Sequence, residues 1–304
     1  MRIPRVILWI IIFILLILLV FQLVTNRQSG HQGTLIIEDI ELDNKVKEVA
    51  KIGKEEISYA DWLQALLDEY GKKVLTDMIN KEVVFQLANE KQLEVPEKYM
   101  DRELSRMYLM YGVLSNDKEE QLREKWEEQI SYRYFLQALL TEKSSVDDAQ
   151  VKEYFDHYKN QYQFSEMVQF SHITVATEDD ARTVMEQLDN GESFDNLAEQ
   201  YSIDEDTRDK RGYLGYFAET TSFLPSVYFD IANELGEGEY SEPYLINGGY
   251  AIVKVHRILP AIELTYEEAY EEVKQDIILS SLPSAIDAKA LWQELEVETI
   301  YEMK

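Results

Sequence analysis

A nearly unbroken run of apolar residues opens the chain, from Val6 to Val24, with only Gln22 interrupting it. At 1.5 Å per residue, a helix of this length matches the roughly 20 residues that a bilayer core requires. Arg2 and Arg5 precede the run, which favours an N-terminus on the cytoplasmic side. No small-residue cleavage site follows it. We therefore predict an uncleaved transmembrane anchor over residues 1–27, with the bulk of the chain outside the cytoplasm.

Residues 48–162 have the periodicity of amphipathic helices, with apolar side chains three or four positions apart. The region opens with a short extended hairpin that turns at Gly53, after which Ser58 can cap the first helix. Residues 28–47, between the anchor and this hairpin, are polar and lack a convincing period, which is typical of a linker. The predicted apolar stripes include Trp62, Leu66 and Tyr70, then Val74, Met78 and Leu87, then Met100, Leu104 and Met107, and finally Leu122, Trp126 and Ile130.

The pattern changes over residues 163–258. Phe170–Val175 and Gly249–Val255 are rich in β-branched and aromatic residues and are bounded by turn-forming residues, as strands are. Two short helical patterns lie between them, the first of which ends at Asn190–Gly191. A glycine-rich turn begins at Gly212. The predicted order is strand, helix, helix, glycine-rich turn, apolar segment and two closing strands.

Residues 259–304 return to helical periodicity. Thr265 with Glu268 forms a capping box, and the apolar face from Ala269 to Ile278 requires a partner. The helical region 48–162 is the obvious partner for this face. We therefore expect the strand-containing module to be inserted between two parts of one helical domain, which makes the fold class α+β.

Composition narrows the range of functions. The 304 residues carry a formal net charge of −28, which disfavours binding to nucleic acid because its phosphates attract a basic surface. The absence of cysteine excludes disulfides, thiolate metal sites and cysteine catalysis. The four histidines lack metal-ligand spacing and no strand is followed by a phosphate-binding loop, so we predict neither a metal nor a cofactor.

The module contains a series of short sequence motifs whose order along the chain is informative. They are Ser171–Ile173, Gly191–Phe194, Leu197–Ala198, Tyr201–Ser202, Gly212, Leu214–Gly215, Phe217, Leu235–Gly238, Ser241–Pro243 and Gly249–Tyr250. This series resembles the parvulin family of peptidyl-prolyl cis/trans isomerases. The helical region around it looks like that of foldases of the PrsA and SurA type. The resemblance implies a small antiparallel sheet surrounded by helices, inserted in a helical chaperone domain.

The resemblance also implies catalytic residues. His172 matches the first of two facing histidines of parvulins, and Asp204 takes the place of their carboxylate or thiol. Ala251 stands where the second histidine would face His172. We therefore expect His172 to find another partner: Asp204, a nearby tyrosine or water. His256 matches no family position, and we expect it on the surface.

The proline pocket follows from the same resemblance. Leu224 matches a pocket leucine or methionine, and Tyr228 matches a pocket phenylalanine, with Phe229 one step away. Leu214 and Phe217 would pack the floor. The acidic segment Thr177–Asp180 occupies the place of the basic cluster that selects phosphorylated substrates, and it would repel phosphate.

These features predict a membrane-anchored, extracytoplasmic foldase that isomerises X–Pro bonds in translocated or secreted proteins. Its partners would be unfolded polypeptides, and Met107–Tyr111 is the best candidate for a client surface because methionine adapts its shape. The alternative is a non-catalytic chaperone or scaffold that uses a degenerate module to bind extended polypeptide. Ala251 keeps this alternative open, as does Asn233, which stands near the place of a second pocket phenylalanine of parvulins. The sequence also leaves a homodimer open.

Overall fold

The computed structural model describes residues 48–282 and 287–301. The predicted anchor (residues 1–27) and linker (28–47) lie outside these ranges. No helix within the described ranges is long and apolar enough to cross a membrane. The chain divides into two compact units, Met1–Lys72 and Lys73–Lys304.

In the first unit, the predicted hairpin and helix cap are confirmed. Strands β1 (Glu48–Ile52) and β2 (Glu55–Ser58) pair antiparallel. They turn at Gly53, whose φ of 65° is readily adopted only by glycine. Ser58 then accepts a hydrogen bond of 3.1 Å from the backbone N–H of Asp61 and starts the helical stretch α2 (Tyr59–Leu66) and η1 (Leu67–Gly71).

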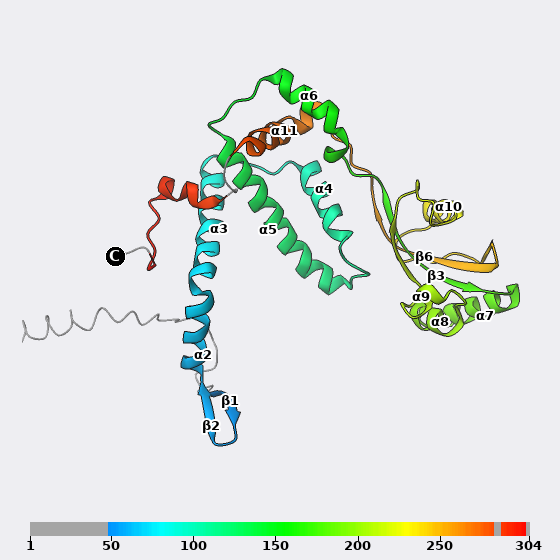
Figure 1. Ribbon diagram of the computed structural model, residues 1–304. Helices are drawn as coiled ribbons and strands as arrows, with labels where there is room; N and C mark the ends of the chain where they lie inside the picture. The colour runs from blue at the N-terminus through cyan, green and yellow to red at the C-terminus, as the bar shows by residue number, and fades with distance from the viewer. Residues whose placement is uncertain (1–47, 283–286, 302–304) are drawn as a thin grey trace, which may run out of the picture. The chain divides into compact units, whose positions relative to one another are not determined.

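In the second unit, some of the helices outside the sheet module precede the sheet in the sequence and the others follow it (Figure 1). Pro96 precedes α4, where its fixed φ suits a helix start. The capping box of Thr265 and Glu268 is confirmed at the start of α11. The helices are α3 (Lys72–Glu90), α4 (Glu97–Tyr108), α5 (Asn116–Thr141), α6 (Asp148–Tyr158), η2 (Lys159–Tyr162), α11 (Tyr266–Ser281) and η3 (Ala288–Leu295).

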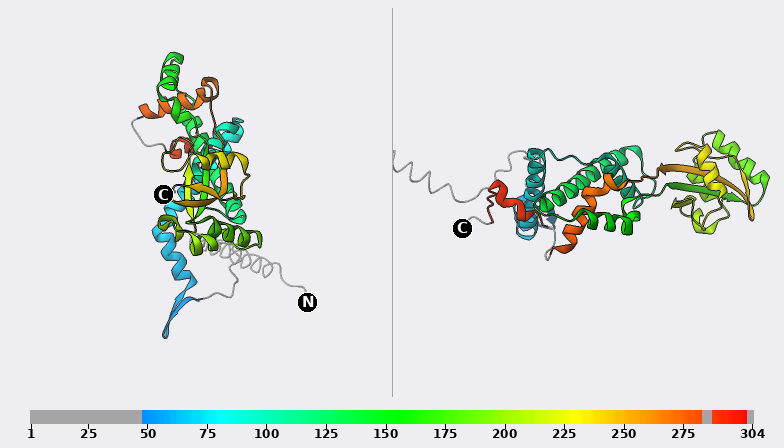
Figure 2. Two further views of the ribbon diagram at one scale, coloured as in Figure 1. Left: turned by 90° about the vertical axis from the view of Figure 1, so that its right-hand side faces the viewer. Right: turned by 90° about the horizontal axis from the view of Figure 1, so that it is seen from above.

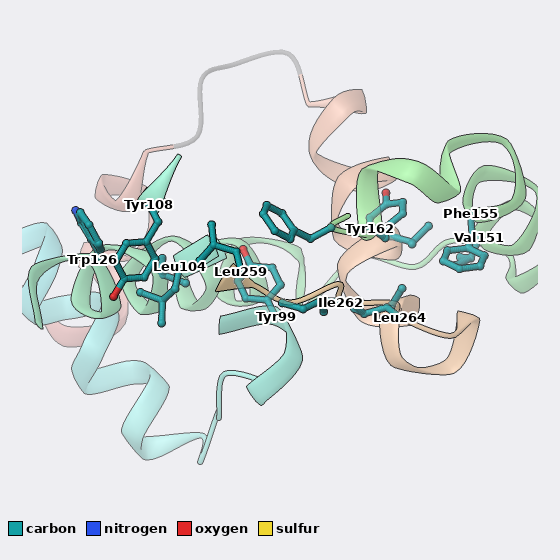
Figure 3. Packing of buried hydrophobic residues seen from close by; sticks show 14 residues of the cluster. Tyr99, Leu104, Tyr108, Trp126, Val151, Phe155, Tyr162, Leu259, Ile262 and Leu264 are labelled. Carbon is teal, nitrogen blue, oxygen red and sulfur yellow. The ribbon is translucent and has the colours of Figure 1, made fainter. Parts of the chain in front are cut away.

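Two apolar clusters join these helices. Figure 3 shows the larger one, in which Tyr99 and Leu104 of α4 and Trp126 of α5 share a core with Phe155 of α6 and residues 259–273. In the other, α3 and α5 pack against Trp292 and its neighbours in η3. The segments before and after the sheet therefore bury their apolar faces against each other, as the pattern predicted for α11.

A buried ion-pair network reinforces this packing. Arg102 of α4 is 0% exposed and forms a bidentate ion pair with Glu272 of α11, with N–O distances of 3.0 and 2.7 Å. Glu103 accepts hydrogen bonds from Arg102, Arg106 and Arg133. Arg102 and Glu272 lie 170 positions apart in the sequence, so this network ties together the two parts of the helical region.

The sheet is small, antiparallel and ordered β4-β3-β6-β5. Helices α7 and α8 cover one face and α10 covers the other, as Figures 1 and 2 both show. Because both faces are covered, β3 is buried along nearly its whole length. The elements are β3 (Met167–Val175), α7 (Glu178–Asp189), α8 (Phe194–Tyr201), α9 (Glu205–Arg208), β4 (Tyr213–Phe217), α10 (Val227–Glu234), β5 (Tyr244–Ile246) and β6 (Gly249–Leu259).

The predicted order of this module and its small antiparallel sheet are confirmed. The structure adds the short helix α9 before the turn at Gly212, and β4, a strand that directly follows this turn and pairs with β3.

Candidate active site

His172 lies in the middle of β3, and its side chain is buried. The prediction that it faces Ala251 is wrong by two residues, because Val253 lies opposite His172 and Ala251 lies opposite Thr174. Gly249 fixes this register: a Cβ there would lie 2.1 Å from the carbonyl oxygen of Val175, so only glycine lets the strands approach at that end.

Both ring nitrogens of His172 have partners. Nε2 lies 2.7 Å from Oδ2 of Asp204 and 3.1 Å from Oγ1 of Thr207. Nδ1 lies 2.8 Å from the hydroxyl of Tyr228. The expectation that Asp204 or a tyrosine would take the place of the missing histidine is therefore confirmed.

The loop from Asp204 to Gly212 holds the carboxylate in place. Asp204 caps α9 by accepting a hydrogen bond from the backbone of Asp206, and it also accepts one of 2.6 Å from the hydroxyl of Thr207. Gly212 closes the loop: its N–H donates to the Thr207 carbonyl and its own carbonyl accepts from the His172 N–H. A Cβ at Gly212 would lie 2.2 Å from the His172 carbonyl oxygen, and φ is +77°, so glycine is required here.

The charges at this site follow from its burial. Burial lowers the pKa of His172 more than the neighbouring Asp204 raises it, so the imidazole is neutral at pH 7. Burial alone would raise the pKa of Asp204, but hydrogen bonds from Thr207 and His172 outweigh it and hold that pKa below its usual value. An ionised carboxylate only accepts, so Nε2 carries the proton and Nδ1 accepts from Tyr228.

All five predicted pocket residues belong to one apolar cluster on the α10 side of the sheet. Tyr228 and Ala251 are buried members of it, and Leu214, Phe217 and Leu224 are half-buried and pack against it. The prediction left out further members of the cluster, which strand alternation and the α10 period could have indicated: Val168, Phe170, Ile231, Val253 and Val255.

Thr207 was also missed. The signal that could have identified it is local, since a Ser or Thr three residues after a helix cap can return a hydrogen bond to that cap.

His256 corrects another expectation. It is half-buried rather than on the surface, and its Nε2 lies 2.8 Å from the hydroxyl of Ser171. Ser171 follows Phe170 and precedes His172, so it points to the opposite face of the sheet from the candidate site. Burial, with help from Lys254, lowers the pKa of His256 to about 4.

The depressed pKa of His256 predicts a pH-dependent stability. The unfolded chain takes up a proton at His256 near pH 6.5, whereas the folded chain does so only near pH 4. The stabilisation is therefore complete above pH 6.5 and is lost as the pH falls toward 4. We expect the midpoint of thermal unfolding to fall over this interval and to fall less in His256→Gln, whose amide can still bond Ser171. Equal slopes for both proteins would contradict this assignment.

Similarity to known proteins identifies the family of this chain. The profile of the PPIC-type PPIase domain family matches residues 146–271. YacD of Bacillus subtilis, whose name marks it as a candidate peptidyl-prolyl cis-trans isomerase, is 32% identical over 260 residues, which cover 84% of this chain and 86% of that protein. Foldase protein PrsA of Geobacillus kaustophilus is 27% identical and covers 79% of each chain.

Among solved structures, PrsA from Bacillus subtilis is 25% identical, covers 85% of this chain and 95% of its own, and aligns with a TM-score of 0.30. The parvulin NmPin of Nitrosopumilus maritimus is 37% identical and covers 31% of this chain and 99% of its own, with a TM-score of 0.28. Given the similarity to YacD over most of both chains, this protein belongs to the family of PPIC-type peptidyl-prolyl cis/trans isomerases.

Proposed function

We propose that the isomerase site is formed by His172, Asp204 and the apolar cluster on the α10 side of the sheet. The chain is a foldase of its family, which isomerises X–Pro bonds and acts as a chaperone on client polypeptides. The observation that supports this location is that His172 is held between Asp204 and Tyr228, which itself belongs to that cluster.

The chemistry requires no covalent step. Rotation about an X–Pro bond has a barrier of roughly 20 kcal/mol because the twisted amide loses its resonance. Resonance in the planar amide places negative charge on the carbonyl oxygen, and twisting withdraws that charge. A carboxylate near the oxygen therefore disfavours the planar amide more than the twisted one, and each 1.4 kcal/mol or so of that difference gives about a tenfold rate.

In this proposal Asp204 supplies the carboxylate. Its side chain is 27% exposed, so one edge can meet a bound peptide while the other is held by His172 and Thr207. Leu224, Phe217 and Leu214 receive the proline ring and exclude water from the amide. His172 orders the carboxylate and exchanges no proton with the substrate.

The test is a pair of assays on the purified full-length chain. One measures isomerisation of non-phosphorylated X–Pro peptides, and the other measures suppression of aggregation of an unfolded client. Isomerisation above the uncatalysed rate that Leu224→Ala reduces supports the site. Peptide binding without any acceleration would favour the alternative, in which the module binds extended polypeptide but does not catalyse.

The surface proposed for client binding lies after α4. Met110 is 78% exposed, and Leu109 and Val113 are also exposed. Tyr108 is instead buried against Trp126, so it belongs to the core and not to that surface. These exposed side chains on a helical domain suit transient contact with unfolded chains, since methionine adapts to varied partners.

We further propose that residues 1–27 anchor the chain in the cell membrane, with the N-terminus in the cytoplasm and the rest outside. The support is the apolar run of the sequence and the two arginines before it. Protease added to cells with a permeable wall should then degrade the region after Trp62. Association of two copies stays a prediction, which analytical ultracentrifugation tests.

The domain division is also proposed: residues 163–258 form the isomerase module, and 48–162 with 259–304 form one helical domain. We expect a chain in which a short Gly/Ser linker replaces residues 166–257 to stay folded, because it keeps the backbone pairing of Phe164 with Ile262 and the Arg102–Glu272 pair. Circular dichroism should show cooperative unfolding of a helical protein. Loss of that transition would contradict the division.

A further inference from the structure

Tyr228 occupies the place of a pocket phenylalanine, yet its hydroxyl contacts the histidine of the site. The side chain is 1% exposed, and its ring packs edge-on against Phe170 with centroids 5.9 Å apart. Its hydroxyl lies 2.8 Å from Nδ1 of His172. A phenylalanine would make the same ring contacts, so the hydroxyl is the feature that the packing does not require.

The hydrogen bonds around His172 leave a single role for this hydroxyl. Asp204 and Thr207 both lie on the Nε2 side, and the ionised carboxylate accepts the Nε2 proton. Nδ1 is then an acceptor that needs a donor. Among the described residues, Tyr228 is the side chain that the structure places within hydrogen-bonding distance of Nδ1.

The strand opposite His172 offers no substitute. Val253 lies directly across on β6, and the next residue on the same face is Ala251. Both are fully buried and neither side chain can donate or accept a hydrogen bond. The partner of His172 therefore comes from a helix, α10, and not from the neighbouring strand.

We propose that the Tyr228 hydroxyl is a positioning group for isomerisation, which holds the His172 ring in the orientation that presents Nε2–H to Asp204. The proposal rests on the site described under Proposed function. Without this donor, Nδ1 is a buried acceptor with no partner among the described side chains, and the ring can turn, which weakens the bond from Nε2–H to Asp204. The carboxylate, still held by Thr207, then loses one of the two side chains that aim it at the bound amide.

A simpler role is satisfaction of a buried hydroxyl, with no consequence for the bond between His172 and Asp204. The two roles differ in what Tyr228→Phe does to His172. The variant keeps the ring in the apolar cluster, so we expect it to fold. In the matched control, Tyr201→Phe, the same change removes a hydroxyl that accepts from Gln187 on the other side of the sheet.

The test uses the full-length chain labelled with 15N-histidine, which contains four histidines. Long-range 1H–15N spectra of the wild type should show His172 protonated on Nε2, with Nδ1 shifted as a hydrogen-bond acceptor; His172→Gln identifies its signals. In Tyr228→Phe we expect the Nε2–H signal of His172 to lose the downfield shift that its bond to Asp204 gives, and kcat/KM to fall by about tenfold, the rate equivalent of about 1.4 kcal/mol. Tyr201→Phe should match the wild type in both readouts.

The outcomes separate this proposal from the one it rests on. A wild-type spectrum with Nδ1 protonated, or an unchanged Nε2–H signal of His172 in Tyr228→Phe, overturns the positioning role whatever the rates. A weakened Nε2–H bond with an unchanged rate overturns it as well. A wild-type chain that does not accelerate isomerisation refutes the proposed catalytic site, while the spectra still decide whether Tyr228 holds the bond between His172 and Asp204.

Discussion

Replacing Arg102 with methionine is expected to lower the free energy of unfolding by about 3–5 kcal/mol, the usual cost of removing one partner from a buried ion pair. Methionine keeps most of the apolar stem of the side chain, so the loss in free energy of unfolding reports the removal of the charge. Glu272 would be left buried, and burial already raises its pKa beside Arg102. Urea denaturation of the full-length chain, followed by circular dichroism, measures the change.

The matched control is Arg123→Met. Arg123 pairs with Glu127 on the exposed face of α5 at 2.7 Å, and such pairs contribute roughly 0.3–0.5 kcal/mol. A double variant, Arg102→Met with Glu272→Gln, should recover part of the loss because no charge remains without its partner. Similar losses in Arg102→Met and Arg123→Met would show that the network does not hold α4 and α11 together.

That network also marks a limit of sequence reasoning. The apolar stripe of α11 was enough to predict that it packs against the earlier helices, because an amphipathic face must be covered. The pairing of Arg102 with Glu272 was not predictable. Charged residues at helical spacing are usually solvated, and nothing local indicates that two of them meet 170 positions apart.

The sheet shows the same division between local and non-local information. The strand patterns at Phe170–Val175 and Gly249–Val255, and the glycines at 212 and 249, predicted the elements of the module. Their register was not predictable to the residue. A shift of two positions leaves the same side chains on the same face, so the apolar pattern fits both registers and Ala251 was paired with the wrong residue.

The candidate site was predicted where resemblance supplied the residues. His172, Asp204 and Tyr228 meet as a set, although only the resemblance to parvulins indicated that they would. The burial of Thr207 and the partial burial of His256 depend on how the loop and the strand pack. Their burial is a property of the folded chain, which composition and spacing do not report.

The second large effect concerns catalysis. Asp204→Asn is expected to lower kcat/KM for non-phosphorylated X–Pro peptides by about 100-fold, near the low end of what loss of a single electrostatic group in an active site costs. Asparagine keeps the shape, and its single oxygen can take the place of Oδ1 and accept from the Asp206 backbone, so α9 should stay capped. Its NH2 group then takes the place of Oδ2 beside Thr207 and His172. What it removes is the negative charge that disfavours the planar amide.

Asp206→Asn provides the control. It removes the same charge from an exposed side chain two residues after Asp204, and it leaves the backbone bond to Asp204 in place. We expect it to change the rate by less than about twofold, because an exposed charge is screened by water and salt. If both variants lose the same activity, the net charge of the loop matters and the position of Asp204 does not. If neither loses activity, Asp204 only caps α9, and the acceleration must come from the apolar pocket alone, where a dry environment by itself favours the less polar twisted amide.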